Sequence, residues 1–208
     1  NEVKKNKEIE ESTLDFFITP CANTAGNCTT YPLPCLTNIP YNRFGITDED
    51  GGNSTPARVD NVDPTIWDLT VINNSGVNVM FKAVDWCVPI YRTGTYNLDD
   101  ETRTAAQFSS DNIGTELIKR CEGFLQFNSK ILFIEIKKRP KKPSEWIKDA
   151  RGKFEETILS FKEHHPHLAS QIIKPILVNT LHTGLATSER VQKRILKDKI
   201  GVGFERHN

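Results

Sequence analysis

The sequence predicts a mixed α/β fold in which a central sheet is flanked by helices. In the second half of the chain, apolar runs of strand length alternate with amphipathic runs of helix length, in the order strand–strand–helix–strand–helix. With 208 residues, of which 37% are hydrophobic, the chain can form one large domain or a domain with a substantial extension. No stretch approaches the roughly 20 apolar residues that span a bilayer, and the charged beginning lacks the apolar segment of a signal peptide. We therefore expect a cytoplasmic protein that does not enter a membrane.

The N-terminal part is predicted to be a loop-rich, cysteine-containing extension over residues 1–64, packed on an α/β core over residues 65–208. Between residues 19 and 64 the chain is dominated by Pro, Gly, Asn, Thr and Cys and contains turn signals such as EDGGNSTP. Residues 2–17 are charged and could form a helix that precedes this segment.

Two β-type runs open the predicted core, at residues 66–72 and 77–91. The sequence Asn-Asn-Ser-Gly at residues 73–76 separates them and predicts a hairpin turn. The polar residues that follow are expected to form a loop, which passes into a short helix around residues 112–120.

The clearest hairpin pattern begins at Cys121. Residues 121–127 are predicted to form one strand, Asn128 and Ser129 a tight turn, and residues 130–139 the second strand. The breaker PKKP then ends this strand.

A helix is predicted after this breaker, with Ser144 as its N-cap and Glu145 in its first turn, where a negative charge suits the helix dipole. Its apolar residues recur at helical spacing and form one stripe, namely Ile147, Ala150, Phe154, Ile158 and Phe161. An apolar strand at residues 172–180, a capped helix at 188–199 and a short strand near 201–206 complete the predicted order.

Glu135 interrupts an otherwise apolar strand, ILFIEIKKR, at residues 131–139. A buried carboxylate is costly unless another group pairs with it. Residues two apart share one face of a strand, roughly 6–7 Å from each other, so Glu135 and Lys137 stand side by side. If Glu122 begins the neighbouring antiparallel strand, its carboxylate meets that of Glu135 across the sheet. Two such carboxylates suit Mg²⁺ or Mn²⁺, which lowers the pKa of bound water, while the lysine orients or deprotonates the attacking water.

This arrangement resembles the PD-(D/E)xK nuclease superfamily. The resemblance covers roughly residues 112–180 and rests on Glu135-Ile136-Lys137 within its strand–strand–helix–strand surroundings. It implies a restriction-endonuclease-like fold, with a mixed central sheet flanked by helices, and a magnesium-dependent hydrolase that cleaves phosphodiester bonds. Carried over, Glu135 would be a metal ligand, Lys137 the catalytic lysine, and Glu122 a second ligand where the family usually has aspartate.

The chain departs from the family's pattern at several points. The glutamate at position 122 is one methylene longer than the usual aspartate. Many members have a glutamine on the first turns of the helix, where this chain offers Arg151 and Lys153, either of which could bind a phosphate. A third metal ligand sometimes comes from an upstream helix, for which Glu116 is the candidate. Asp85, on a preceding strand, is an alternative acid.

Basic residues are concentrated beside the predicted site. Residues 1–116 contain 8 Lys+Arg and 17 Asp+Glu, whereas residues 117–208 contain 19 and 10, and the densest stretch is 130–153. This asymmetry favours a polyanionic partner, expected to be nucleic acid, with DNA as the first choice. The residues expected to contact its phosphates are Lys138, Arg139, Lys141, Lys142, Arg151 and Lys153. The oligomeric state stays open, a homodimer included.

Two other functions remain open at this point. One is a catalytically inactive nuclease-like module that binds nucleic acid or a protein partner, which Glu122 and the missing glutamine favour. The other is an interaction protein stabilised by Zn²⁺ at Cys21, Cys28 and Cys35, which recur every seven residues but lack the paired Cys-x-x-Cys spacing. Reduced thiols are expected for the five cysteines, with a disulfide among the first three as the alternative.

Overall fold

The computed structural model describes residues 14–17, 35–48, 55–92, 108–109, 116–181 and 187–207. Its centre is a mixed six-stranded sheet. In sheet order the strands are β1 (Leu36–Ile39), β5 (Val79–Ala83), β9 (Gly123–Phe127), β10 (Lys130–Ile136), β11 (Ile176–Val178) and β12 (Glu205–His207). The first four strands pair antiparallel and the last three parallel. The expectation of a mixed α and β fold is therefore confirmed.

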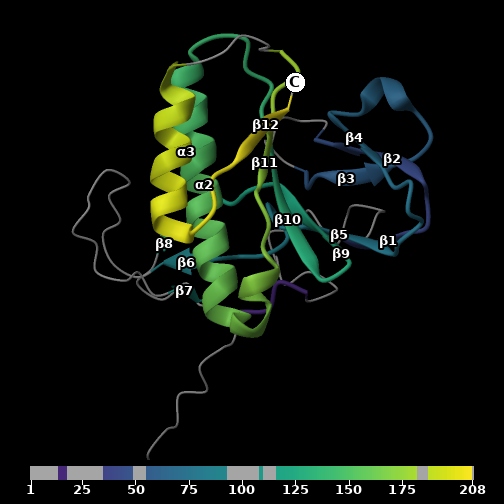
Figure 1. Ribbon diagram of the computed structural model, residues 1–208, viewed down its shortest axis with the longest axis horizontal. Coiled ribbons are helices and arrows are strands. Elements are labelled where there is room, and N and C mark those ends of the chain that lie inside the picture. Colours follow the sequence, from purple (N-terminus) through teal and green to yellow (C-terminus); the bar gives the residue numbers. More distant parts are fainter. Residues whose placement is uncertain are drawn as a thin grey trace, which may run out of the picture.

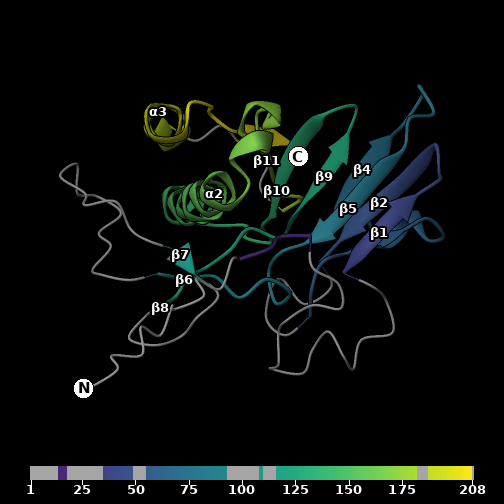
Figure 2. The same cartoon turned by 90° about the horizontal axis from the view of Figure 1, so that it is seen from below.

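Two long helices, α2 (Pro143–His164) and α3 (Thr187–Ile200), lie side by side against this sheet, as Figures 1 and 2 show. The predicted apolar stripe of α2 is completely buried, because it faces the sheet and the neighbouring helix. Lys142, in a left-handed conformation, is the N-cap of α2 and Pro143 opens its first turn, so the expected N-cap at Ser144 is corrected by two residues. Short 3₁₀ helices, η1 (Pro64–Ile66) and η2 (Pro166–Gln171), complete the helical elements of the described ranges. None of these helices combines the length and the apolar character that crossing a bilayer requires.

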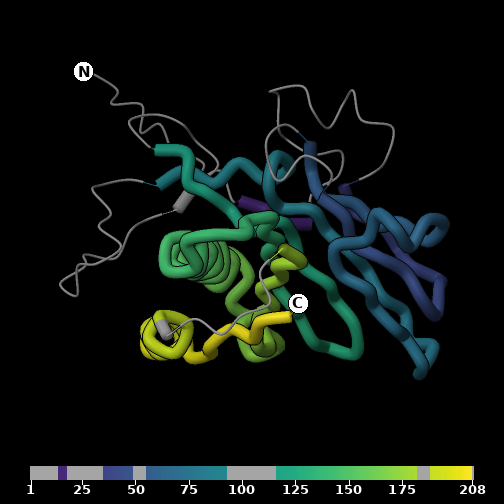
Figure 3. Tube along the Cα trace, turned by 90° about the horizontal axis from the view of Figure 1, so that it is seen from above, coloured from purple at the N-terminus to yellow at the C-terminus, as the bar shows by residue number. Residues whose placement is uncertain are grey.

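Two three-stranded sheets accompany the central one. The first has the order β3 (Arg58–Asp60), β2 (Arg43–Thr47) and β4 (Leu69–Ile72); the second has β7 (Phe108–Ser109), β6 (Tyr91–Arg92) and β8 (Glu116–Leu117). The sheet of β2, β3 and β4 and the helix pair lie at opposite ends of the molecule, with the central sheet between them, which is also visible along the trace in Figure 3.

Two local expectations are corrected by these pairings. A turn does form at residues 73–76, with Gly76 at φ +60°, but β4 and β5 on either side of it belong to different sheets and form no hairpin. Residues 116 and 117 form strand β8, where a short helix was expected. The local pattern correctly identified a chain reversal at residues 73–76 and a polar segment before residue 116. The strands that pair with β4, β5 and β8 come from other parts of the chain, which the local pattern does not show.

The predicted extension contributes strands to the central sheet and to the sheet of β2, β3 and β4. β1 forms one edge of the central sheet through its pairing with β5, and β2 pairs with β3 on one side and with β4 on the other. Further towards the N-terminus, the Phe16 ring packs edge-on against Phe161 of α2, with centroids 5.1 Å apart. The helix expected over residues 2–17 falls outside the described residues except for 14–17, which form a turn.

The hairpin of β9 and β10 confirms the prediction for this segment and fixes the register at the site. Asn128 and Ser129 both have positive φ, at 46° and 55°, as a tight turn between the strands requires. Phe124 is paired with Phe133, and both rings contact Phe161 of α2. Because side chains alternate along a strand, Glu122 and Glu135 share the helix-facing side with these two rings.

Candidate functional site

Glu122 and Glu135 lie next to each other beneath α2. Gly123 pairs with Ile134, so the register continues from Glu122, just before β9, to Glu135 on β10. Both side chains are buried, with 1% and 0% of the residue exposed. The two carboxylates meet the Lys153 Nζ of α2, at 3.5 Å from Glu122 and 3.0 Å from Glu135. The strand period and the hairpin register thus bring together the two acids that the sequence singled out.

Gly123 permits this close arrangement. A Cβ atom at this position would lie 2.4 Å from the main-chain oxygen of Lys82 and 2.9 Å from the Phe81 ring. Only glycine therefore lets β5 approach β9 immediately beside Glu122.

Lys137 stands beside Glu135, as the strand period predicts. Its Nζ lies 2.8 Å from Glu135 Oε1 and 2.7 Å from Asp149 Oδ2 of α2. Its main-chain N–H donates to the Val178 oxygen at 2.8 Å, which fixes the backbone at the end of β10. Asp149 was not among the expected site residues, although it precedes Lys153 by four residues and so shares its helix face.

Lys153 lies inside the site and not on the outer surface. Its side chain is only 11% exposed, and its Nζ lies 4.0 Å from Asp85 Oδ2 in addition to its contacts with the two glutamates. Asp85 in turn is paired with Arg120 at 2.9 Å. The sequence led us to expect that Lys153 contacts phosphates of a nucleic acid. In the structure its neighbours are carboxylates, and Lys153 is a buried counter-charge to them.

The two glutamates retain unused hydrogen-bonding capacity. Among the described residues, Glu122 Oε2 and Glu135 Oε2 are buried without a hydrogen-bond partner, whereas Glu135 Oε1 faces the ammonium groups of Lys137 and Lys153 at 2.8 and 3.0 Å. Buried acceptors without a donor are rare in folded proteins and indicate a missing partner. Mg²⁺ is typically bound by one or two carboxylates, with water and substrate phosphate as its other ligands. The glutamate pair fits such a cation, whereas no group of three or more His, Cys, Asp or Glu side chains that could hold a metal occurs among the described residues.

Charge and burial set the protonation of the site. Burial, followed by the charge of Glu135, raises the pKa of Glu122 well above its ordinary value. Burial opposes the charged form of Lys137, but Glu135 and Asp149 outweigh it and raise the pKa of this lysine. For Lys153, burial is likewise outweighed by Glu135, Glu122 and Asp85, and its pKa is raised further. Both ammonium groups are therefore charged at neutral pH in the metal-free protein, and Lys137 is placed to donate hydrogen bonds and positive charge.

Replacing Glu122 with glutamine (E122Q) is expected to stabilise the metal-free protein at neutral pH. A folded-state pKa above the ordinary 4.5 means that the folded protein holds a proton that the unfolded chain releases, so stability falls as the pH rises through this window. The variant lacks this loss, and its melting temperature should exceed that of the wild type by about 2–4 °C for each kcal/mol gained. Thermal unfolding measured at a series of pH values should show the difference disappearing towards about pH 4.

Glu155→Gln (E155Q) is a matched control for E122Q, because Glu155 is also a buried glutamate but is held in ion pairs. Its carboxylate is paired with Arg151 at 2.6 Å and with Lys199 at 3.3 Å, so removing the charge leaves a buried guanidinium without its ion pair and should destabilise the protein. An E122Q variant that melts below the wild type at neutral pH would contradict the assignment of Glu122 as a destabilising buried charge.

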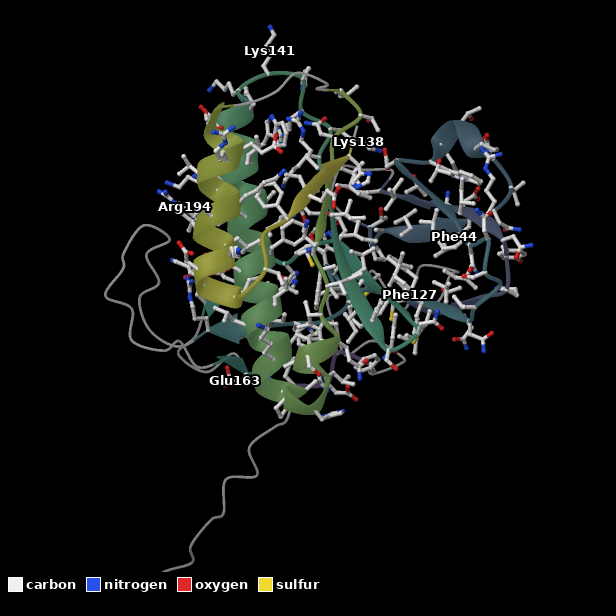
Figure 4. All side chains as sticks on the ribbon, viewed as in Figure 1. Phe44, Phe127, Lys138, Lys141, Glu163 and Arg194 are labelled. Atoms are coloured by element: carbon white, nitrogen blue, oxygen red, sulfur yellow. The ribbon has the colours of Figure 1, made fainter. Side chains whose placement is uncertain are left out.

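A basic cavity of about 480 Å³ opens beside Lys137 and Asp149. Five of its lining residues are basic: Lys119, Lys137, Arg139, Lys141 and Lys142. In Figure 4, Lys141 projects outwards at the top of the molecule, beyond the start of α2. Lys137 thus connects the buried glutamate pair with a positively charged surface.

The remaining predicted phosphate contacts are distributed differently. Lys138 lies between the central sheet and the sheet of β2, β3 and β4, where its Nζ contacts Asp68 Oδ2 at 3.0 Å and donates to the Asp48 main-chain oxygen at 2.5 Å. Lys142 is exposed and paired with Glu145 at 3.1 Å. Lys142 lines the cavity together with Arg139 and Lys141, whereas Lys138 is not among the residues that line it.

Arg151 is not available to a nucleic acid, contrary to the expectation from sequence. It is 1% exposed, and its guanidinium contacts Glu155 on α2 at 2.6 Å and Gln192 on α3 at 3.0 Å. Its position one residue after Ala150 of the apolar stripe places it in the interface between the two helices, where it has a structural role.

Glu116 is not brought into the glutamate pair either. It lies on β8 with a side chain that is 69% exposed, and its partner is Arg92, at 2.5 Å. Arg92 also contacts Glu156 of α2 at 2.5 Å. The expected third metal ligand is therefore part of a neighbouring ion-pair cluster.

Asp48 is a further acid near the site that sequence reasoning missed. It is 1% exposed, and its charge contributes to raising the pKa of Glu122, after burial, Glu135 and Asp85. In the sequence it lies in the polar segment TDEDGG, which has the composition of an ordinary surface turn. Only the long-range packing of β2 against the central sheet brings it here.

The proposed zinc ligands are described only in part. Cys35 is buried at the start of β1, where its Sγ accepts a hydrogen bond from Lys82 Nζ at 3.0 Å. Cys21 and Cys28 lie outside the described residues, so a zinc site formed by these three cysteines stays a prediction. Stoichiometric zinc in the purified protein, lost on Cys→Ser replacement, would support it.

Comparisons with models of protein families, with curated proteins and with solved structures give no match to this chain. Its function must therefore be inferred from the geometry of its own residues.

Proposed function

We propose that this protein is a divalent-metal-dependent nuclease that hydrolyses phosphodiester bonds, with DNA as the expected substrate. The observation that carries the proposal is the pair of buried glutamates, Glu122 and Glu135, each with a carboxylate oxygen that has no hydrogen-bond partner in the described part of the chain, and with Glu135 next to the charged Lys137. Lys137 also lines the basic cavity, so a phosphate bound there would lie next to the pair.

Each part of the site has a distinct role in this proposal. Glu122 and Glu135 would hold Mg²⁺ or Mn²⁺, which supplies Lewis acidity at the scissile phosphate. Lys137 stabilises the negative charge that develops on the phosphoryl oxygens, because its ammonium group is held in place by Glu135 and Asp149 before the substrate arrives. Arg139 and Lys141 bind the backbone phosphates on either side.

The order of elements around the site supports the resemblance to the PD-(D/E)xK superfamily. A three-strand antiparallel segment of β5, β9 and β10 is followed by α2 and then by the parallel strand β11. Glu122 departs from the usual aspartate, yet its carboxylate shares Lys153 with Glu135, so the longer side chain still reaches the centre of the site. Lys153 itself comes from the helix on which many members carry a glutamine.

The test is cleavage of end-labelled DNA by the purified protein, with Mg²⁺, Mn²⁺ or EDTA. We expect cleavage with Mg²⁺ or Mn²⁺ and none with EDTA, because the glutamate pair alone has no electrophile to offer. Single- and double-stranded DNA and RNA of the same sequence establish which nucleic acid is the substrate. Absence of cleavage of all four substrates with every divalent metal would exclude the nuclease function.

A catalytically inactive module that binds nucleic acid is the second candidate, and Lys153 is the observation that favours it. Its ammonium group lies between the two glutamates and already offers them a counter-charge without a metal. On this alternative, the basic cavity binds nucleic acid with an affinity that falls steeply with salt, and no metal confers cleavage. Binding without cleavage in the assay above would establish this second function.

A further inference from the structure

Lys153 and Lys137 both contact Glu135, but they are held differently. Lys137 has Asp149 as a hydrogen-bond partner on the cavity side, at 2.7 Å. The contacts of the Lys153 Nζ, by contrast, are carboxylates of the site: Glu135 at 3.0 Å, Glu122 at 3.5 Å and Asp85 at 4.0 Å. Lys153 is therefore positioned as a cation shared among several acids.

The position of this ammonium group is the one that a bridging metal would need. A cation bound by both glutamates must lie between their oxygens, at roughly 2.0–2.1 Å from each if it is Mg²⁺. The Lys153 Nζ lies close to this position, 3.5 Å from Glu122 Oε1 and 3.0 Å from Glu135 Oε1. A divalent cation and an ammonium group cannot share this space, because they would overlap and repel each other.

A second cavity offers Lys153 another position. This cavity, of about 310 Å³, is lined by Lys153, by the acids Asp149, Glu116 and Glu156, and by two further basic residues, Arg92 and Lys119, which pair with these acids. Glu116 is exposed, and Glu156 lies on the same helix as Lys153. Because a lysine side chain has four flexible methylene groups, its ammonium group can move from the buried glutamates into this cavity, where it would join the ion pairs of these acids, without a change of the backbone.

We propose that Lys153 is an internal counter-ion of the glutamate pair, and that a divalent cation binds Glu122 and Glu135 only by displacing it towards the neighbouring cavity. This proposal deepens the proposed function, on whose metal site it rests. It makes Lys153 a positioning and regulatory residue: it stabilises the metal-free site and sets the metal concentration at which the site is filled.

The first test is Mn²⁺ binding to the metal-free protein, measured by calorimetry, for the wild type and for Lys153→Met (K153M). Methionine fills a similar volume but removes the charge, so K153M should bind Mn²⁺ at least about tenfold more tightly. Its melting temperature should be lower without metal and should recover when Mn²⁺ is added. Lys162→Met is the matched control: Lys162 lies on the same helix and its Nζ donates to the Ile200 main-chain oxygen, so its loss should leave Mn²⁺ affinity unchanged.

The second test uses only the wild type and does not depend on the folding of a variant. Reductive methylation with formaldehyde, followed by peptide mass spectrometry, measures the reactivity of Lys153 with and without Mn²⁺. Displacement should increase labelling of Lys153 several-fold, whereas Lys162 should not respond.

The outcomes separate this proposal from the nuclease function. One outcome is that Mn²⁺ binds with equal affinity to the wild type and to K153M, with unchanged labelling of Lys153. In that case the proposed displacement of Lys153 is wrong, while metal binding by the glutamate pair is retained. If Mn²⁺ binds neither protein while both remain folded, the displacement and the metal-dependent function are both wrong. Tighter binding by K153M together with increased labelling of Lys153 supports the displacement.

Discussion

Replacing Glu135 with glutamine (E135Q) is expected to reduce metal-dependent cleavage of DNA by more than about 100-fold. Changes to groups that merely support a metal ligand already cost roughly 10–100-fold, and Glu135 is proposed as a ligand itself. Glutamine preserves the shape of the fully buried side chain, but it lacks the charge that faces Lys137 at 2.8 Å and Lys153 at 3.0 Å. The measurement is the single-turnover rate with saturating Mg²⁺ or Mn²⁺, accompanied by DNA affinity in EDTA, which should be close to that of the wild type.

Glu145→Gln (E145Q) provides the control for this variant. Glu145 also lines the basic cavity, but its side chain is exposed and paired with Lys142, away from the glutamate pair. E145Q should therefore cleave at the wild-type rate. If E135Q cleaves as fast as E145Q, Glu135 is not a metal ligand, and the proposed mechanism fails at its central residue.

Replacing Lys137 with methionine (K137M) is expected to lower the cleavage rate by about 10²–10³-fold, the usual effect of removing one preorganised donor from a developing negative charge. The wild-type ammonium group is fixed by Glu135 and Asp149, which also raise its pKa, so it is fully charged at neutral pH. The single-turnover rate at saturating DNA and metal, compared between K137M and the wild type, checks this prediction.

Lys141→Met (K141M) distinguishes charge at the site from charge on the surface. Lys141 lines the same cavity but is proposed to contact only backbone phosphates. Its loss should weaken DNA binding and reduce the salt dependence by about one counter-ion, while the rate at saturating DNA stays unchanged. A K137M variant that shows this same behaviour, with weaker binding and an unchanged rate, would assign Lys137 to the binding surface instead of the chemistry.

The local parts of the site could be predicted from the sequence because they depend on short-range periodicity. The two-residue period of β10 places Glu135 and Lys137 on one face, and the tight turn at Asn128 and Ser129 fixes the register that brings Glu122 alongside. The helical stripe of α2 identified its buried face for the same reason.

The contributions of α2 to the site could not be read in the same way. The stripe shows which face of a helix is buried, but not how the helix is rotated over the strands. This rotation decides that Asp149 reaches Lys137 and Lys153 reaches the glutamates, while Arg151 points into the contact with α3. Basic residues in a dense run look alike in the sequence. Their separation into a buried counter-charge, an interhelical contact and surface residues arises only from tertiary packing.

The assignment of strands to sheets was also beyond local patterns. β4 and β5 are neighbours in the sequence with a good turn between them, yet each pairs with strands that lie elsewhere in the chain. Asp48 reaches the vicinity of Glu122 through the same long-range packing.

The position of β1 at the edge of the central sheet has a practical consequence for dissecting this protein. β1 covers one side of β5, and β5 is the strand that supports β9 and hence Glu122. A fragment that begins after residue 64 would expose the amide and carbonyl groups of β5 along a bare edge, which invites association with other chains. The part of the chain that carries the glutamate pair therefore depends on β1 to cover its sheet edge, and function should be assigned with proteins that keep the segment from Cys35 onwards.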